Sequence, residues 1–316
     1  MSQLNIIIPD RLIGQRIDAA MATMLPDYSR SKLTAWVKAG GALVDGQTFK
    51  PKEKVVGGEI VELTIKAERV NKWLPEDIPI EVVFEDEDII VVNKPVGLVT
   101  HPGAGNWTGT LANALLHYDS SLEKLDRAGI VHRLDKNTSG LMVVARSELA
   151  QKNLVEQLQT HSVSREYSAI VYGHMISGGT IDEPIGRDPK DRIRQAVVEE
   201  GDGKYAVTHY RVIDRFAHHT HIKAILETGR THQIRVHMSY VGHPLIADAM
   251  YGGKIRLPKK ADDALKNALK GFSRQALHAK KLTLIHPISG QEMSWKAPLP
   301  QDMQDLLAVL QTYDSV

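Results

Sequence analysis

The chain has 316 residues, of which 42% are hydrophobic and 24% charged, and its formal net charge is +1. This is an ordinary globular composition, and the length favours about two domains with a core of normal size. The absence of cysteine excludes disulfides, thiolate zinc sites and a thiol nucleophile.

The N-terminal residues MSQLNIIIPDRL lack a charged segment followed by a long apolar one, so they do not predict a signal peptide. The apolar runs at 89–92 and 141–145 are too short to span a bilayer. We therefore expect a soluble cytoplasmic protein.

Residues 1–65 predict a small α+β domain. Apolar residues at helical spacing predict a helix over 14–24, and a second helix follows Pro26, with Asp27 or Ser29 as its cap. Asp45 and Gly46 then predict a tight hairpin, followed by a strand. Three residues of the second helix are expected to be buried: Leu33, Trp36 and Val37.

Residues 66–79 are polar and contain proline, which predicts a linker. From residue 80 to 316, strands outnumber helices and often follow one another directly. This pattern favours a mixed, mostly antiparallel sheet flanked by helices, and hence an α+β fold. The expected strands are 88–94, 141–146, 166–174, 205–216 and 219–228. The expected helices are 147–160, with Ser147 as its cap and Ala150, Leu154, Val155 and Leu158 as its buried stripe, then 231–241, 261–270 and 301–312.

Charge is unevenly distributed along the chain. Residues 29–54 and 253–281 are basic, whereas residues 76–88 are acidic. Basic regions of this kind suit a protein that binds a polyanion through part of its surface, although solvated surfaces also carry such runs.

One candidate site is the segment AGIVHRLDKNTSGLMVVAR, residues 128–146. It places Asp135 at the start of a loop beside a strand, where catalytic groups are often found. Local chemistry alone favours a simpler interpretation, in which Asp135 accepts hydrogen bonds from the backbone of residues 137 and 138 and only shapes a turn.

Two further segments carry candidate residues. In 226–253, Gln233 and Arg235 lie near a predicted helix start, and with Arg230 they form an anion-favouring site that suits a phosphate or the carboxylate of Asp135. In 164–173, Tyr167 follows a charged pair and is a candidate surface aromatic on which a base could stack, or else a half-buried strand tyrosine.

Together these segments resemble the RluA-type family of pseudouridine synthases, and residues 1–65 resemble an S4 RNA-binding domain. The resemblance covers almost the whole chain. The residues that carry it are His132-Arg133-Leu134-Asp135, Thr138-Ser139-Gly140, Arg165-Glu166-Tyr167, Gly229 to His237, Gly242-His243-Pro244-Leu245, Asp248, Tyr251-Gly252, Asn93-Lys94-Pro95, His101-Pro102-Gly103, and Tyr28-Ser29-Arg30-Ser31 with the Gly40 to Gly46 hairpin. Ala247 departs from the family, which usually has glycine there, so we expect a slightly different turn.

The resemblance implies an enzyme without a cofactor or metal that isomerises uridine to pseudouridine. It assigns Asp135 as the catalytic carboxylate, Arg235 as its charged partner and Tyr167 as the residue that stacks on the flipped uracil. It implies that Arg133 fills the vacated space, and further RNA contacts are expected at His132, Arg230, Arg30, Lys32 and Lys38. The implied substrate is large-subunit (23S) ribosomal RNA, at the stem-loop that faces the decoding site (helix 69), and the enzyme is expected to be a monomer.

Three other classes of protein compete with this interpretation. A metal-dependent hydrolase would use clustered histidines, but no carboxylate stands at ligand spacing in the sequence. A non-catalytic RNA-binding protein would not need the catalytic set, and a glycosidase would need a second carboxylate beside Asp135. The histidines in question are His218, His219, His221, His232 and His237, which we interpret as sheet and RNA-facing residues.

Overall fold

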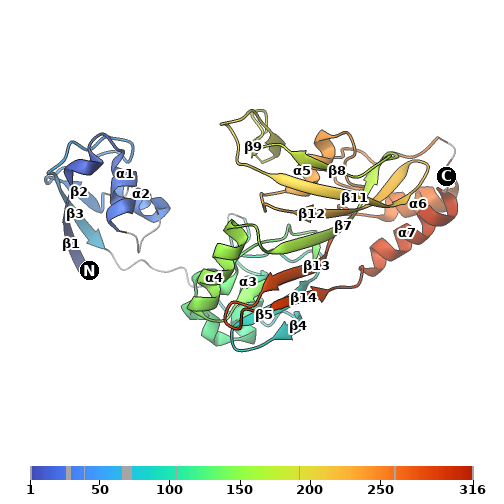
Figure 1. Ribbon diagram of the computed structural model, residues 1–316, viewed down its shortest axis with the longest axis horizontal. Helices are drawn as coiled ribbons and strands as arrows, with labels where there is room; N and C mark the ends of the chain where they lie inside the picture. Colours follow the sequence, from blue (N-terminus) through green and yellow to red (C-terminus); the bar gives the residue numbers. More distant parts are fainter. Residues whose placement is uncertain are drawn as a thin grey trace. The chain divides into compact units, whose positions relative to one another are not determined.

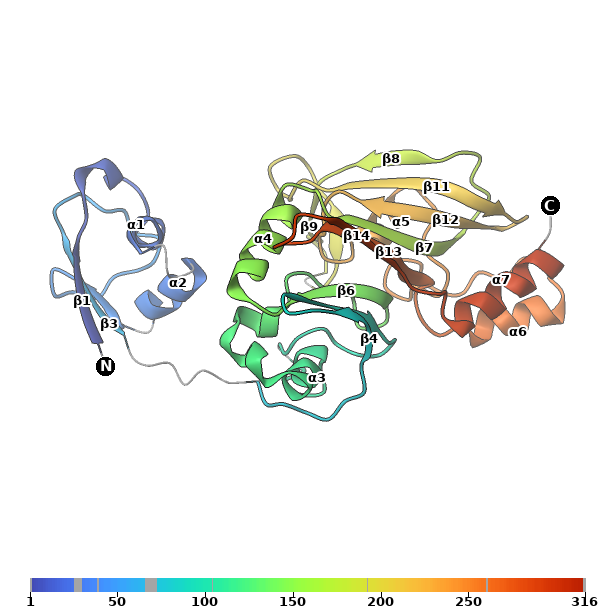
Figure 2. The ribbon, with the colours of Figure 1, turned by 60° about the horizontal axis from the view of Figure 1, so that its bottom comes forward.

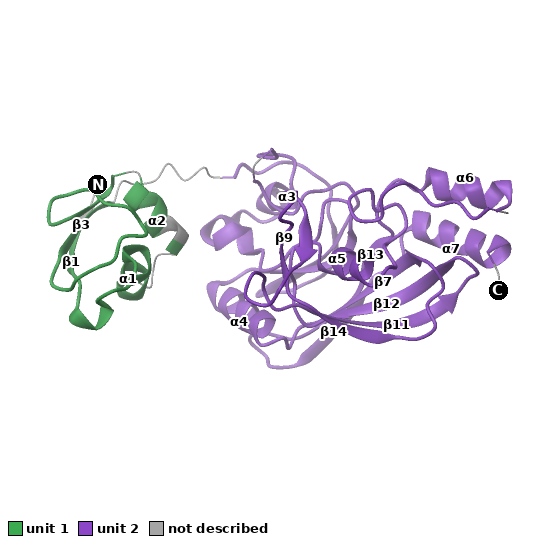
Figure 3. Cartoon of the chain, turned by 90° about the horizontal axis from the view of Figure 1, so that it is seen from above, with its two compact units in different colours: residues 1–72 green, residues 73–316 purple. Residues whose placement is uncertain are grey.

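The computed structural model describes residues 2–25, 30–38, 40–65, 73–103, 105–191, 193–259 and 261–314. The chain forms two compact units, residues 1–72 and 73–316 (Figure 3). The boundary shortens the predicted linker of 66–79. Trp73 and Ile78 pack against the core of the second unit, and the Asn113 side chain donates to the carbonyl of Leu74 at 2.8 Å. Residues 66–72 lie outside the described residues.

The first unit is a three-stranded antiparallel sheet, in the order β1–β3–β2, with two helices. Leu33, Trp36 and Val37 are buried as expected. Asp45 and Gly46 adopt positive φ in the predicted turn, and the Val44 and Gln47 backbones exchange hydrogen bonds across it at 2.8 and 2.9 Å, which confirms the tight hairpin. β2 also pairs with β3. The expected helix caps, Asp27 and Ser29, lie outside the described residues. The elements are β1 (Ser2–Ile7), a 3-10 turn η1 (Asp10–Leu12), α1 (Ile17–Met24), α2 (Arg30–Lys38), β2 (Ala42–Val44) and β3 (Ile60–Ile65).

The second unit contains the helices and strands that follow. The helices are α3 (Leu111–Tyr118), α4 (Glu148–Gln159), α5 (Gln233–Tyr240), α6 (Asp263–Gly271) and α7 (Gln301–Tyr313), with 3-10 turns η2 (Ser120–Lys124) and η3 (Asp126–Gly129). The strands are β4 (Glu81–Glu85), β5 (Ile89–Lys94), β6 (Ser139–Ala145), β7 (Ser164–Tyr172), β8 (Gly179–Asp182), β9 (Ile185–Arg187), β10 (Gln195–Val197), β11 (Val207–Arg215), β12 (His219–Leu226), β13 (Leu277–Ile285) and β14 (Glu292–Lys296).

Nine of these strands form one sheet in the order β4-β5-β6-β13-β7-β12-β11-β8, with β14 paired to β13 (Figure 2). Only the β6–β13 pairing is parallel, which confirms the expected mixed, mostly antiparallel sheet. Gly140 explains how β6 and β13 approach each other, since a Cβ there would lie 2.2 Å from the carbonyl oxygen of Ala279. Side chains larger than hydrogen are excluded at this position.

Each face of the sheet has its own helices (Figure 1). The core on one face includes α3, the loop before β6 and α5. On the other face, α4 packs over β5 and β6, while α6 and α7 pack over β7. Ser147 caps α4 as predicted, accepting a bond from the Ala150 amide at 3.2 Å. Val155 was expected to be buried but is 36% exposed, because the helix turns that position away from the sheet.

Candidate active site

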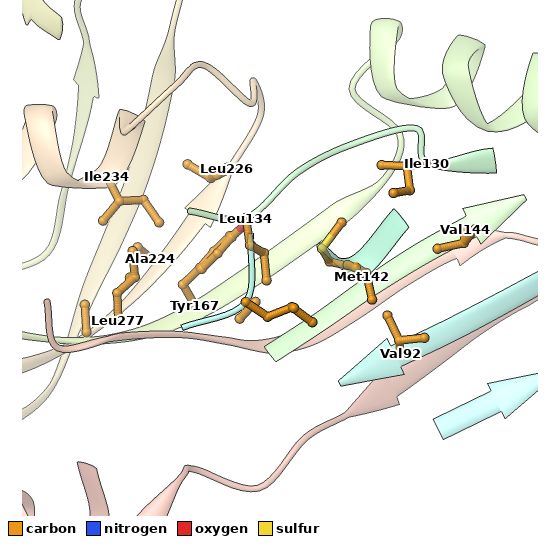
Figure 4. Packing of buried hydrophobic residues seen from close by; sticks show 14 of the residues in the cluster. Val92, Ile130, Leu134, Met142, Val144, Tyr167, Ala224, Leu226, Ile234 and Leu277 are labelled. Atoms are coloured by element: carbon orange, nitrogen blue, oxygen red, sulfur yellow. The ribbon is translucent and has the colours of Figure 1, made fainter. Parts of the chain in front are cut away.

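Asp135 lies on the loop between η3 and β6, and the main chain of this loop is tightly held. The Thr138 amide donates to the backbone carbonyl of Asp135 at 3.0 Å, so the backbone and not the carboxylate closes the turn. The Thr100 hydroxyl donates to the Leu134 carbonyl at 2.8 Å. Leu134 is buried beside Tyr167 (Figure 4). The loop therefore presents the Asp135 carboxylate without using it as a structural cap.

Lys94 adds a second anchor beneath the same loop. Its ammonium donates to the carbonyls of Pro95, Leu98 and Lys136, at 2.8, 2.9 and 3.2 Å. The side chain is 1% exposed, and burial lowers the pKa of Lys94 to about 7, with the charge of Asp135 opposing the shift. Because one of its three acceptors is the residue after Asp135, Lys94 fixes where that loop stands relative to β5.

Arg235 joins two carboxylates from distant parts of the chain. Its Nη1 donates to Asp135 Oδ2 at 2.9 Å, while Nε and Nη2 donate to the two oxygens of Asp248 at 2.7 and 2.9 Å. Burial alone would lower the pKa of Arg235, but the two carboxylates overcome that effect and raise it. The guanidinium is therefore permanently charged, and its planar fork fixes both partners.

These side chains meet in a cavity of about 540 Å³, a size typical of ligand sites. Asp135 and Tyr167 line it together with the arginines Arg133, Arg165 and Arg230. This lining combines one carboxylate and one tyrosine with several cations, which suits a uridine within a polyanionic chain.

Tyr167 is not the surface aromatic that we considered. It is 6% exposed and belongs to the core over β7, with its ring at the cavity wall. Burial raises the pKa of Tyr167, the Arg165 guanidinium opposes this and the charge of Asp135 adds to it. The sequence suggested exposure because a charged pair precedes Tyr167, but Arg165 is itself buried at 6% exposure.

The expected RNA-contacting residues of this unit differ in whether their side chains are already bonded within the protein. Arg133 is exposed at the cavity, while the Arg230 Nε donates to the Tyr205 carbonyl at 2.8 Å. The ring Nε2 of His132 accepts from the Val143 amide at 3.0 Å, and burial with the neighbouring Arg165 lowers the pKa of His132 to about 3. His132 is thus a neutral residue that fixes the loop, and no cationic contact to phosphate is expected from it.

The expected RNA contacts of the first unit are located as follows. Arg30 pairs with Asp18 at 2.9 Å, yet its side chain remains 53% exposed. Lys38 is exposed at the end of α2. The side chain of Lys32 lies outside the described residues.

Three of the clustered histidines bond carboxylates in the structure. His218 and His219 bond the two oxygens of Asp314, at 2.8 and 2.7 Å, and His221 bonds Asp214 at 2.9 Å. Asp314 lies 96 and 95 positions from His218 and His219, so no local pattern indicated that contact, whereas Asp214 lies only seven positions before His221 and its bond was missed at the sequence level. Among the described residues, the one group with three ligand atoms close together is Asp86, Asp88 and His286, and it contains none of the clustered histidines.

Sequence reasoning also gave Asp248 no role. Its side chain is fully buried, and besides Arg235 it holds the amides of Met250 and Tyr251, each at 3.1 Å. A carboxylate engaged in this way is not free to act as the second carboxylate of a glycosidase. Asp248 is among the residues that carry the family resemblance, but nothing in the sequence around it indicated its contact with Arg235 of α5.

Ala247 itself adopts the left-handed conformation that glycine usually provides, with φ of +56°. The expectation of an altered turn is therefore wrong in this respect. Alanine accepts the strain, which costs about 1–2 kcal/mol, because the following Asp248 is locked in place.

Comparison with known proteins agrees with the geometry of the site. Residues 88–240 match the family model described as RNA pseudouridylate synthase. The chain is 53% identical over 309 residues to "Ribosomal large subunit pseudouridine synthase D" of Escherichia coli K12, covering 98% of this chain and 94% of the relative. It is 51% identical over 304 residues to the protein of the same name from Xanthomonas campestris, covering 96% and 91%.

Among solved structures, "Human RNA Pseudouridylate Synthase Domain Containing 4" matches with a TM-score of 0.57 and 26% identity, covering 73% of this chain and 93% of that one. The chain therefore belongs to the RNA pseudouridine synthase family, and it is an isomerase of RNA uridines. In the described part of the chain, no helix is long and apolar enough to cross a membrane.

Proposed function

We propose that this enzyme converts specific uridines of large-subunit ribosomal RNA to pseudouridine, with the decoding-site-facing stem-loop (helix 69) as its target. The names of its relatives supply the substrate class, because they are large-subunit enzymes more than half identical over nearly the whole chain. Ribosomal RNA in a large-subunit precursor is then the partner, and the enzyme acts as a monomer in the cytoplasm without a cofactor.

The observation that carries the proposed mechanism is that Asp135 is the one carboxylate among the described residues of the cavity lining, beside several arginines. Asp135 side-chain atoms are 16% exposed, so a ligand can reach them, whereas Asp248 is fully enclosed. Arg235 donates to Oδ2 of Asp135, and among the described residues no side chain donates a hydrogen bond to Oδ1. This arrangement fits a carboxylate that acts directly on the target nucleotide.

The reaction breaks the N1–C1′ bond of uridine, turns the base and joins C5 to C1′, so no atom or electron is gained or lost. The target base first leaves its stack, because C1′ and C6 are otherwise out of reach. In our proposal Arg133 occupies the vacated space, Tyr167 packs on the flipped uracil, and Asp135 attacks C1′, attacks C6 or removes the C2′ proton. At the end C5 loses its proton and N1, freed from C1′, gains one, so the product is an isomer of the substrate.

The first unit would supply affinity for RNA. It resembles an S4 domain in sequence, it carries exposed basic side chains such as Arg30 and Lys38, and it has a hydrophobic core of its own. Contacts of such side chains to phosphate position an RNA without reading much of its sequence.

Asp135→Asn tests the catalytic assignment. The variant keeps the size of the side chain but removes its charge, so we expect no detectable turnover with RNA affinity nearly unchanged. Tritium release from 5-tritiated uridine in a stem-loop transcript measures turnover. Asp214→Asn, a carboxylate far from the cavity lining, is the control and should stay active. Turnover of Asp135→Asn within tenfold of wild type would exclude Asp135 as the catalytic group.

Mapping pseudouridines in ribosomal RNA from cells that lack this protein tests the substrate. We expect the modification to disappear from the proposed stem-loop and to return with the wild-type gene but not with Asp135→Asn. An unchanged stem-loop, with losses elsewhere in RNA, would refute the proposed target and leave the chemistry intact.

A further inference from the structure

We propose that His232 is a second positioning residue for Asp135, with its proton held on Nε2 by the hydroxyl of Tyr251. This inference rests on the proposed catalytic role of Asp135. His232 lies at the start of α5, in the cavity lining, and its Nε2 is 3.8 Å from Asp135 Oδ1. Arg235 contacts the other oxygen, Oδ2. The two residues thus approach the carboxylate from its two ends.

The hydrogen bonds around Tyr251 determine which nitrogen of His232 carries the proton. The Gln195 amide, which can only donate, gives its proton to the Tyr251 hydroxyl oxygen at 3.1 Å. Of these two partners only His232 Nδ1, 2.8 Å away, can accept the proton of the hydroxyl, so we assign the hydroxyl as the donor in this bond. A neutral imidazole that accepts at Nδ1 carries its proton on Nε2. That proton is directed to the side of the ring where Asp135 lies.

The surroundings favour this neutral form. Burial lowers the pKa of His232, opposed by the charge of Asp135 and reinforced by the nearby Arg235. Burial also raises the pKa of Tyr251, so its hydroxyl keeps the proton that it donates. A second proton on His232 would occupy Nδ1 and remove the acceptor for Tyr251.

Tyr251 also supports Arg235, so one side chain serves both partners of Asp135. The Arg235 guanidinium lies over the Tyr251 ring, 5.0 Å from its centroid, and the His232 ring packs edge-on against it at 5.6 Å. Asp248 accepts from the Tyr251 amide at 3.1 Å as well as from Arg235. The position of Tyr251 is therefore fixed by the same carboxylate that fixes Arg235.

The backbone of His232 gives independent support. Its φ is +59°, a left-handed conformation that costs a residue other than glycine about 1–3 kcal/mol. This conformation places the ring between Tyr251 and Asp135. Strain of this kind persists where surrounding contacts over-determine a conformation, and it concentrates at functional sites.

The separation of 3.8 Å is too long for a hydrogen bond in the free enzyme. Catalytic hydrogen bonds often tighten only in the substrate complex. With the RNA bound, we expect His232 to donate to Oδ1 while Arg235 holds Oδ2, which fixes the plane of the carboxylate toward the nucleotide. This hydrogen bond should therefore increase the rate of turnover and leave RNA affinity unchanged.

Three variants test this arrangement by single-turnover tritium release at saturating RNA. His232→Phe removes both nitrogens, and Tyr251→Phe removes only the hydroxyl while keeping the ring under Arg235. Each should slow turnover by roughly tenfold, the effect of losing one hydrogen bond of about 1.4 kcal/mol, with the Kd for RNA unchanged. His232→Gln places an amide near the position of Nε2 and should restore turnover to within about threefold of wild type.

A double-mutant cycle supplies the test that a merely structural role would not pass. Glutamine has no Nδ1, so Tyr251→Phe should have almost no effect in the His232→Gln background. Additive losses, or full turnover in His232→Phe, would overturn the proposal. Tyr240→Phe, an exposed tyrosine, is the control for loss of a hydroxyl. If His232→Phe does not fold, Tyr251→Phe and His232→Gln still decide the matter.

Asp135→Asn, assayed in parallel, distinguishes a failure of the proposed function from a failure of the proposed role of His232. An active Asp135→Asn would refute the proposed function itself. An inactive Asp135→Asn beside fully active His232 and Tyr251 variants would refute only this inference.

Discussion

Replacement of Arg235 by lysine should damage catalysis far more than RNA binding. Arginine donates three hydrogen bonds to carboxylates, two to Asp248 and one to Asp135. A lysine ammonium is a compact charge on a flexible stem and cannot reproduce this fork. Asp248 side-chain atoms are 0% exposed whereas those of Asp135 are 16% exposed. We therefore expect the ammonium to pair with Asp248, which has no water to replace its partner.

Asp135 then loses one hydrogen bond to a charged donor, which is worth about 1.5–3 kcal/mol. If that bond fixes the carboxylate for reaction, turnover should fall by roughly 10-fold to 150-fold. Single-turnover tritium release at saturating RNA gives the rate, and a binding titration gives the Kd, which should change less than threefold.

Arg146→Lys is the matched control for this change. Arg146 also bridges two carboxylates, at 2.8 Å to Asp119 and 3.5 Å to Glu85, but it is not in the cavity lining. Its turnover should equal that of wild type. The reasoning fails if Arg235→Lys, correctly folded, reacts at the wild-type rate, because Arg235 would then not be the functional partner of Asp135.

Three further predictions concern stability and the first unit. Ala247→Gly should raise the free energy of unfolding by about 0.5–1 kcal/mol, because relief of the left-handed strain exceeds the added entropy of the unfolded chain; an unchanged or lower Tm would contradict the strain argument. Burial alone would raise the pKa of Asp314, but hydrogen bonds from His219 and His218 outweigh burial and lower it. The stabilisation that the ionised Asp314 gives to the folded state is therefore complete above the ordinary aspartate pKa of ~3.9, and it is lost as the pH falls through the lower pKa of the folded state. Asp314→Asn should thus cost about 2 kcal/mol in urea unfolding at pH 7, and the cost should shrink as the pH is lowered below ~3.9; a cost that does not change with acidification until the protein unfolds would refute the linkage. Removal of residues 1–72 should flatten the slope of log affinity against log salt concentration by roughly 3–4, if this unit makes about four to six phosphate contacts. The truncated enzyme should still convert a minimal stem-loop at high enzyme concentration. A folded truncation with an unchanged slope would show that the basic residues of this unit do not contact RNA.

Short-range patterns predicted much of the secondary structure and the position of the loop that carries Asp135. The Ser147 cap and the apolar spacing after it predicted α4, because capping and helical periodicity act within a few residues. Likewise the order of Asp135, Tyr167 and Arg235 along the chain, with the residues around them, was enough to indicate the family. Such features depend on local chemistry, which the order of residues contains directly.

Only the tertiary structure decided which side chains share the site. Asp135 and Arg235 are 100 positions apart, and their contact depends on how the β6 loop and α5 are brought to one face of the sheet. The same packing buries Tyr167 and places Asp248 beside Arg235 and His232 beside Asp135. The Asp135–Arg235 pair was expected from the sequence, but the contacts of Asp248 and His232 and the burial of Tyr167 were not, because strand order and helix placement depend on the burial of apolar surface summed over the whole unit. Hydrogen bonds between distant side chains form only after that packing is fixed.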